Sequence, residues 1–231
     1  MKTIGLLGGM SWESTQTYYR LINEGVKSRL GGLHSAKLVL YSVDFAEIEA
    51  LQHQGDWPAT ARILSGAALS LENAGADFLM IGTNTMHKVA PEVEEAINIP
   101  LLHIADATAK VLTQDNIQRV GLLGTRFTME QAFYRERLEA AGIEVVTPDA
   151  PQRAEVHRVI YEDLCQGEIQ AASREAYLAV INSLAEQGAQ AVILGCTEIG
   201  LLIKQTDTPV PLYDTTAIHA AQAVNRALTG D

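Results

Sequence analysis

The chain repeats part of its own sequence, and this repeat constrains its fold more than any other feature. The matched pairs are residues 4–9 (IGLLGG) with 120–125 (VGLLGT), residues 75–83 (GADFLMIGT) with 188–196 (GAQAVILGC), and Pro100-Leu101 with Pro211-Leu212. The three pairs occur in the same order along the chain. The two members of each pair lie 116, 113 and 111 residues apart, respectively. Chance resemblance between apolar strands is the alternative explanation. The order and spacing favour duplication of one structural unit.

Short apolar runs alternate with longer segments in which apolar residues recur every three or four positions. The runs predict strands that are buried on both faces: Ile4–Leu7, Leu38–Val43, Phe78–Ile81, Val120–Leu123, Ile143–Val146 and Ala191–Leu194. The spaced segments predict helices, with stripes formed by Tyr18, Leu21, Ile22 and Val26, and by Tyr177, Val180, Ile181 and Leu184. This alternation predicts an α/β protein of two pseudo-symmetric domains, each a mostly parallel sheet flanked by helices. The expected site is a cleft between the halves, beyond the carboxyl ends of the strands.

Composition excludes several classes of protein. The 231 residues include 17 Lys and Arg against 28 Asp and Glu, and the resulting net charge of −11 argues against binding to nucleic acid or to an anionic membrane. No apolar run approaches the roughly 20 residues of a membrane helix. The first residues lack the cleavage site of a signal peptide, so we expect a cytoplasmic protein with reduced thiols. The two cysteines are Cys165 and Cys196.

Small residues end the first predicted strand of each half: Gly8-Gly9-Met10-Ser11 in one and Gly124-Thr125-Arg126 in the other. Neither is a G-x-G-x-x-G dinucleotide motif, and the chain has no P-loop or G-x-S-x-G nucleophile motif. Glycine here either lets the chain turn into the next helix or exposes backbone N–H groups that bind an anion such as a carboxylate. The motif alone favours neither interpretation.

The second matched pair places a reactive type of side chain directly after a strand and a glycine. Thr83 follows Gly82 in the first half, and Cys196 follows Gly195 in the second. A cysteine at the start of a helix has its thiolate stabilised by the helix dipole, so we expect a lowered pKa for Cys196. Packing is the alternative role for a lone cysteine. Cys165 has no counterpart in the repeat and resembles a late position of a helix that stops at Gly167.

The motifs at residues 4–11 (IGLLGGMS), 83–87 (TNTMH) and 195–198 (GCTE) together resemble the aspartate/glutamate racemase family, over essentially the whole chain. The chain is most similar to the bacterial branch that includes broad-specificity amino-acid racemases. The resemblance implies two α/β domains, residues 1–97 plus 207–231 and residues 98–206, whereas the repeat alone would divide the chain near residue 115. It also implies an amino-acid substrate, a homodimer, no pyridoxal phosphate and no bound metal.

The resemblance also implies the site residues. Thr83 and Cys196 match the two acid/base residues that flank the substrate Cα, one from each half. Most of the family has cysteine at both positions, and this chain has threonine at position 83. A hydroxyl is a far weaker acid than a thiol, so we expect Cys196 to be the competent base and the two directions of reaction to be unequal.

Further positions match substrate contacts in the family. Asn84, Thr85 and Thr197 match groups that hold the α-carboxylate, and Glu198 is counted with the substrate-binding residues. Met10, Gln52 and Thr125 match contacts to the rest of the substrate, with helix capping and loop structure as their alternative roles. Residues 49–53 (EALQH) include no Arg or Lys for a distal carboxylate, which leaves room for neutral amino acids such as homoserine beside aspartate and glutamate. His87 and His103 are expected to be structural.

Three other functions remain open. Relatives on this fold include decarboxylases of malonate-type acids that keep a single cysteine. A maleate-type isomerase would need a nucleophile at the first-half position, which Thr83 disfavours. A catalytically idle amino-acid-binding protein is consistent with a degraded cysteine pair, although Cys196 and the predicted carboxylate-binding residues argue against idleness.

Overall fold

The chain folds into two compact units. A computed structural model describes residues 1–230. Unit 1 contains Met1–Ile104 and the C-terminal segment from His219, and unit 2 contains Ala105–Ile218. The chain therefore enters unit 2 at the start of helix α5 (Ile104–Gln114) and returns to unit 1 within helix α11 (Thr215–Thr229).

The domain limits expected from the sequence differ from these units. They placed residues 98–104 in the second domain and residues 207–218 in the first. Strand β7 (Leu212–Asp214) pairs with β6 (Ala191–Gly195), and the Tyr213 hydroxyl donates a 2.7 Å hydrogen bond to Asp115. These contacts keep residues 212–214 within unit 2.

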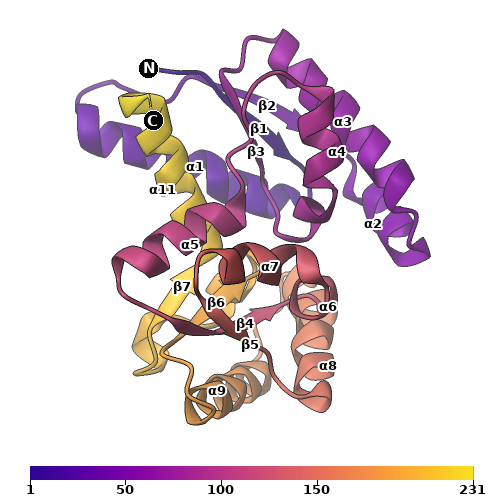
Figure 1. Ribbon diagram of the computed structural model, residues 1–231, viewed down its shortest axis with the longest axis vertical. Helices are drawn as coiled ribbons and strands as arrows, with labels where there is room; N and C mark the ends of the chain where they lie inside the picture. Colours follow the sequence, from indigo (N-terminus) through magenta and orange to yellow (C-terminus); the bar gives the residue numbers. More distant parts are fainter. Residues whose placement is uncertain (231) are drawn as a thin grey trace. The chain divides into compact units, whose positions relative to one another are not determined.

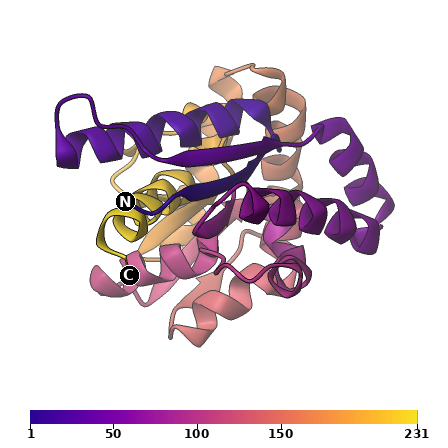
Figure 2. The same cartoon turned by 90° about the horizontal axis from the view of Figure 1, so that it is seen from above.

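Unit 1 is built on a three-stranded parallel sheet with the order β2-β1-β3. Its strands are β1 (Ile4–Gly8), β2 (Leu38–Ser42) and β3 (Phe78–Ile81). Its helices are α1 (Trp12–Leu30), α2 (Phe45–Gln54), α3 (Trp57–Asn73), the 3-10 turn η1 (Thr85–Val89) and α4 (Ala90–Ala96), together with the end of α11. Helices α1 and α11 cover one face of the sheet and α3 and α4 the other (Figure 1; Figure 2).

The alternation of side chains along β1 explains this three-layer arrangement. Ile4 and Leu6 pack with Tyr18, Ile22 and other residues of α1 and α11 on one face. Leu7 packs on the other face with the apolar side of α3 and α4. Because both faces of β1 are covered, the strand is apolar throughout, as the sequence predicts for a central parallel strand.

Unit 2 is built on a four-stranded parallel sheet with the order β5-β4-β6-β7. Its other two strands are β4 (Arg119–Gly124) and β5 (Glu144–Val146). Its further α-helices are α6 (Arg126–Glu130), α7 (Ala132–Ala140), α8 (Ala150–Arg158), α9 (Ala171–Glu186) and α10 (Ile199–Leu202). It also contains the short π-helix η2 (Val159–Asp163) and the 3-10 helices η3 (Leu164–Gln166) and η4 (Gln205–Asp207). Helices α8 and α9 pack with Leu123, Val192 and Leu194 on one face of this sheet, and α7 lies on the opposite side (Figure 1).

The sequence repeat is a structural repeat. β1 and β4 are matched central strands, and β3 and β6 are their matched neighbours. The Leu79 N–H donates to the Pro100 carbonyl at 3.0 Å, and in the second unit Val192 N–H donates to the Pro211 carbonyl at 2.8 Å. The duplicated segments thus keep the same hydrogen-bond register, which confirms the predicted fold of two parallel α/β sheets flanked by helices.

Two strand predictions need correction. β2 and β5 were expected to be buried on both faces, yet both lie at sheet edges and are largely half-buried or exposed. Strand β7 was not predicted at all. It has only three residues, and Asp214 at its end breaks the apolar pattern on which the other predictions relied.

A buried histidine joins separate segments of unit 1. His219 is fully buried, its Nε2 lies 2.8 Å from the Leu102 carbonyl, and its Nδ1 lies 3.0 Å from the Tyr18 hydroxyl. A carbonyl only accepts, so Nε2 carries the proton and Nδ1 accepts from Tyr18. Burial lowers the pKa of His219 to about 4, which keeps the ring neutral at physiological pH.

This histidine should make the protein less stable in mild acid. Unfolding returns His219 to an ordinary pKa of about 6.5, so the unfolded chain takes up a proton that the folded chain refuses below that pH. The His219→Gln variant keeps an amide donor for Leu102 and does not titrate. We expect the advantage of wild type over this variant in the free energy of unfolding to shrink by about 2 kcal/mol between pH 7.5 and pH 5, as measured by urea denaturation. A difference that is the same at both pH values would contradict this prediction.

Candidate active site

In unit 1 the candidate residues follow the carboxyl ends of β1 and β3. The Gly82 N–H donates to the Leu7 carbonyl at 2.8 Å, which holds the end of β3 against β1. Thr83 comes next and is half-buried, and Asn84 and Thr85 are buried at the start of η1. Parallel pairing therefore sets Thr83, Asn84 and Thr85 at the edge of the sheet where β1 also ends.

The glycines after β1 are required by close packing. Gly9 has a φ of +92°, and a side chain there would overlap the backbone of Val43. Its N–H donates to the Thr15 hydroxyl at 2.7 Å, and that hydroxyl in turn donates to the Ser11 carbonyl at 2.8 Å. The amide of Gly9 is thus bonded within the protein, which favours the turn interpretation of Gly8-Gly9 over an anion site at this amide.

Two further unit 1 candidates are buried at different places. Met10 directly follows the glycines and is buried in the cluster on the α3 side of the sheet. Gln52 lies near the end of α2 and is also buried, next to the exposed contact between the His53 ring and the Glu49 carboxylate. A buried glutamine amide is costly without hydrogen-bond partners. Gln52 is not left in that state, because it does interact with a neighbouring group.

In unit 2 the structure brings three predicted residues into direct contact. The Cys196 thiol donates a 2.9 Å hydrogen bond to Glu198 Oε2, and the Thr197 hydroxyl donates to the same oxygen at 2.6 Å. Glu198 is buried, while Cys196 and Thr197 are half-buried. The sequence placed Glu198 with the substrate-binding residues. The geometry makes its carboxylate the acceptor of the Cys196 proton, and the C-T-E spacing is the signal that could have indicated this contact.

The expected low pKa of Cys196 is wrong for this structure. Burial raises the pKa of the thiol well above its usual value, and the negative charge of Glu198 raises it further. The following helix α10 has only four residues, so its dipole is small. Cys196 is therefore a protonated thiol at rest, with an adjacent carboxylate that can receive its proton.

The other unit 2 candidates have clear local roles. The Thr125 hydroxyl accepts from the Thr128 N–H at 3.4 Å, so Thr125 is the N-cap of α6. Cys165 lies in η3, and Gly167 directly follows this short helix. Gly167 adopts the left-handed conformation and ends the helix, as the sequence predicted. Cys165 packs on the same apolar cluster as Cys196 and contributes to its raised pKa. Gly195 is needed because a side chain there would lie 2.7 Å from the Leu123 carbonyl oxygen.

Two negative findings apply to residues 1–230. No group of three or more His, Cys, Asp or Glu side chains is arranged to hold a metal ion in this part of the chain. No helix within it has both the length and the apolar character needed to cross a membrane.

The fold and these residues define a class of protein. Two duplicated parallel α/β units each place a hydroxyl or thiol side chain after a strand and a glycine: Thr83 after β3 and Gly82 in unit 1, and Cys196 after Gly195 at the end of β6 in unit 2. The chain belongs to the Asp/Glu/Hydantoin racemase family, whose model matches residues 7–223.

Relatives of known name and structure agree with this assignment. The broad specificity amino-acid racemase RacX of Bacillus subtilis is 25% identical over 230 residues, which cover 97% of this chain and 98% of that protein. A Yersinia pestis protein of known structure, classed with the Asp/Glu racemases, is 60% identical in sequence to this chain and superposes with a TM-score of 0.93. The match covers 99% of this chain and 100% of the Yersinia pestis chain. An aspartate racemase homologue of known structure from Pyrococcus horikoshii is 35% identical in sequence and superposes with a TM-score of 0.86. This match covers 98% of the present chain and 99% of the Pyrococcus horikoshii chain.

The contact between Cys196 and Glu198 can be tested through thiol reactivity. A Cys165→Ser background leaves Cys196 as the single thiol of the chain. Glu198→Gln removes the negative charge and keeps an acceptor oxygen, so we expect the pKa of Cys196 to fall. The pH dependence of alkylation by iodoacetamide measures this change. Glu186→Gln on the exposed face of α9 is the matched control and should leave the pKa unchanged. An unchanged pKa in Glu198→Gln would refute the contact.

Proposed function

We propose that the protein is an amino-acid racemase that inverts the Cα centre by two-base proton transfer without pyridoxal phosphate or metal. The hydrogen bond from the Cys196 thiol to Glu198 is the observation that carries this proposal. A thiol with an adjacent carboxylate can lose its proton when a base is needed and regain it afterwards. The named racemases among the relatives support the same reaction class.

The proposed steps use groups that the chain itself supplies. Glu198 accepts the proton of Cys196, and the resulting thiolate removes the α-proton of the substrate. The carbanion that forms then takes a proton from the Thr83 hydroxyl on its opposite face, and water returns a proton to Thr83. Glu198 then passes the proton it accepted to solvent, where it neutralises the hydroxide left when water reprotonated Thr83, so Cys196 is again a thiol beside a carboxylate before the next turnover. One C–H bond breaks and another forms, so the product differs from the substrate only in configuration.

The α-carboxylate needs hydrogen-bond donors because negative charge develops beside it in the transition state. We propose that Asn84, Thr85 and the backbone N–H of Thr197 supply them, because the Thr197 hydroxyl already donates to Glu198. Met10, Gln52 and Thr125 are proposed to contact the rest of the substrate. Glu198 acts in this proposal on Cys196 rather than on the substrate. The buried positions of Asn84 and Thr85 directly after Thr83 support the assignment.

The substrate range is proposed to include aspartate and glutamate and to extend to neutral amino acids. Residues 49–53 contain no Arg or Lys that would select a distal carboxylate. The negative net charge of −11 also gives no general attraction for dicarboxylates. The name of the Bacillus subtilis relative, a broad specificity racemase, is consistent with this range.

The proposed acid/base groups differ in strength, so the two directions should have different kcat values. A panel of L- and D-amino acids in D2O, followed by NMR for loss of the α-proton and by optical rotation for inversion, tests the function and this asymmetry together. We expect exchange with inversion, at unequal rates from the two enantiomers. Cys196→Ser should lose at least about a hundredfold in rate, and Thr83→Cys should bring the two directions closer together. Equal kcat values from the L and the D enantiomer in wild type would contradict the asymmetry.

The same panel separates the alternative functions. Release of carbon dioxide from a substituted malonate, without exchange of amino-acid α-protons, would support a single-cysteine decarboxylase. Saturable binding of an amino acid without exchange would support a binding protein. Full exchange by Cys196→Ser would refute the assignment of Cys196 as the base.

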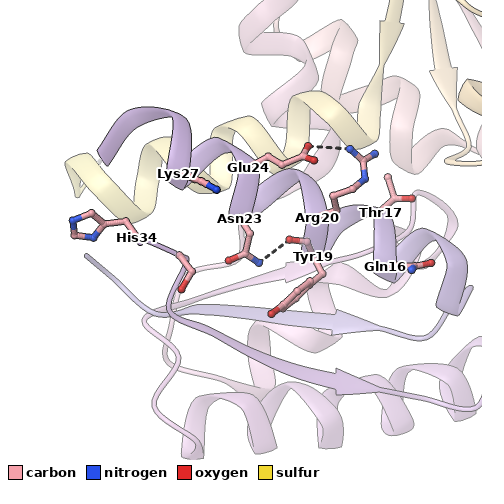
Figure 3. A pocket seen from close by; sticks show the side chains of 9 residues that line it. Gln16, Thr17, Tyr19, Arg20, Asn23, Glu24, Lys27 and His34 are labelled. Carbon is pink, nitrogen blue, oxygen red and sulfur yellow. Dashed lines mark hydrogen bonds and ion pairs between the residues drawn. The ribbon is translucent and has the colours of Figure 1, made fainter. Parts of the chain in front are cut away.

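We also propose that the protein is a cytoplasmic homodimer. Both cysteines are free thiols, which suits a reducing compartment. Unit 1 has several exposed large apolar side chains: Trp12, Tyr19, Leu30, Leu33, Leu40 and Tyr41. We propose that those on α1 contribute to the dimer interface, where a partner would cover them. Between α1 and residues 34–35 lies a hollow of about 620 Å³, and Figure 3 shows the side chains that line it, Tyr19 and His34 among them.

The charges beside this hollow fit a second copy of the same chain. Arg20 and Glu24 form an exposed ion pair at 2.9 Å on α1 (Figure 3). A two-fold axis across α1 would bring Arg20 of one copy to Glu24 of the other, so this surface is complementary to itself.

Light scattering after size exclusion tests the dimer. We expect wild type at twice the chain mass of 25.0 kDa and Tyr19→Glu at the mass of one chain, because the new charge would be buried in the interface. Leu69→Glu, an exposed apolar position on α3, is the control and should remain dimeric. A monomeric wild type, or a dimeric Tyr19→Glu variant, would contradict the proposed surface.

A further inference from the structure

Three histidines are buried where the chain leaves and re-enters unit 1. The chain leaves unit 1 after Ile104 and returns at His219. His87, His103 and His219 are each at most 3% exposed. The rings of His87 and His103 meet edge to face with centroids 4.4 Å apart, and those of His87 and His219 lie 6.0 Å apart. A packed group of histidines beside Thr83 suggests a role beyond filling the core.

His87 makes two backbone contacts that fix its protonation. Its Nδ1 lies 2.7 Å from the Thr83 carbonyl oxygen, and its Nε2 accepts from the Ile104 N–H at 3.2 Å. Because a carbonyl only accepts and an N–H only donates, Nδ1 carries the proton and Nε2 carries none. His87 is therefore a neutral imidazole in a single tautomer, which bridges Thr83 to the residue where the chain leaves unit 1.

The bond to Thr83 controls the direction of one peptide group. On the upstream side the Gly82 N–H is held by the Leu7 carbonyl at 2.8 Å. On the downstream side the His87 ring holds the Thr83 carbonyl, and the His87 N–H donates to the Asn84 carbonyl at 3.1 Å. The peptide between Thr83 and Asn84 is thus fixed from both sides, and with it the Cα–Cβ direction of Thr83.

The segment of residues 102–104, which His87 connects to Thr83, is also fixed by hydrogen bonds. His219 Nε2 donates to the Leu102 carbonyl at 2.8 Å, and the Tyr18 hydroxyl donates to His219 Nδ1 at 3.0 Å. The segment 102–104 is therefore tied to α1 through His219 and to Thr83 through His87. This network gives the Thr83 peptide a rigid support, which an acid/base group needs in order to meet its substrate atom.

We propose that His87 is a positioning residue for the racemase reaction, which holds the Thr83 main chain so that the Thr83 hydroxyl reaches the substrate Cα. The inference rests on the proposed function of Thr83. His87 itself does not exchange a proton with the substrate, because both of its ring nitrogens are engaged by the backbone.

Two variants divide the contacts of His87. His87→Asn places an amide donor near the position of Nδ1, which keeps the bond to Thr83 and loses the acceptor for Ile104. His87→Gln places an amide oxygen near the position of Nε2, which keeps the acceptor for Ile104 and loses the donor to Thr83. Each variant loses one hydrogen bond, so we expect similar falls in Tm.

Their catalytic effects should differ. We expect His87→Gln to lower kcat for inversion at least about tenfold with KM changed by less than about threefold, and His87→Asn to keep kcat within about threefold of wild type. Exchange of the α-proton in D2O on the Cys196 side does not need Thr83. The ratio of inversion to exchange should therefore fall in His87→Gln and remain unchanged in His87→Asn.

The outcomes distinguish this inference from the function on which it rests. A purely structural His87 would lower kcat in both variants in step with Tm and leave the ratio of inversion to exchange unchanged, which would overturn the inference alone. Wild-type protein that exchanges no amino-acid α-proton would overturn the racemase proposal and this inference with it. Loss of inversion with exchange retained, in His87→Gln only, supports both.

Discussion

The parallel pairing of β1 with β3 and of β4 with β6 is the constraint on which the rest of the structure depends. Parallel strands end at the same edge of a sheet, so the segments that follow them emerge side by side. In unit 2 the register pairs Gly124 with Gly195, and no larger residue fits at Gly195 because the Leu123 carbonyl lies too close. Close approach of these strands delivers Thr125 and Cys196 to one edge, and the same rule delivers Met10 and Thr83 in unit 1.

The two units have the same frame and different chemistry. The counterpart of Glu198 in the repeat is Thr85, so the carboxylate that accepts from Cys196 has a hydroxyl in the matching place of unit 1. The Thr83 carbonyl is instead held by His87. A thiol beside a buried carboxylate can change its protonation during a reaction, whereas a threonine hydroxyl acts by donating from a fixed position. This divergence gives a physical basis for unequal rates in the two directions.

Much of the fold could be predicted from the sequence because its signals are local. All six predicted strands are present with ends within one residue of their predicted positions, and the repeat reproduces the register of the sheets. The burial of β2 and β5 was wrong because lateral position in a sheet depends on the order of strands, which apolar content does not encode. Strand β7 was missed since a three-residue strand ending in Asp214 has too weak a pattern, and its pairing with β6 also moved the boundary of unit 2.

The sequence by itself determined the duplicated α/β fold and the placement of Thr83 and Cys196 after matched strands, because both follow from periodicity and repeat. The tertiary structure alone decided the state of these residues. The pKa of Cys196 is raised rather than lowered, since burial and the Glu198 carboxylate outweigh the dipole of a four-residue helix. The bonds of His87 to Thr83 and Ile104 likewise depend on how η1 packs against residues 102–104. Protonation and orientation are set by neighbours in space, and a linear pattern does not contain them.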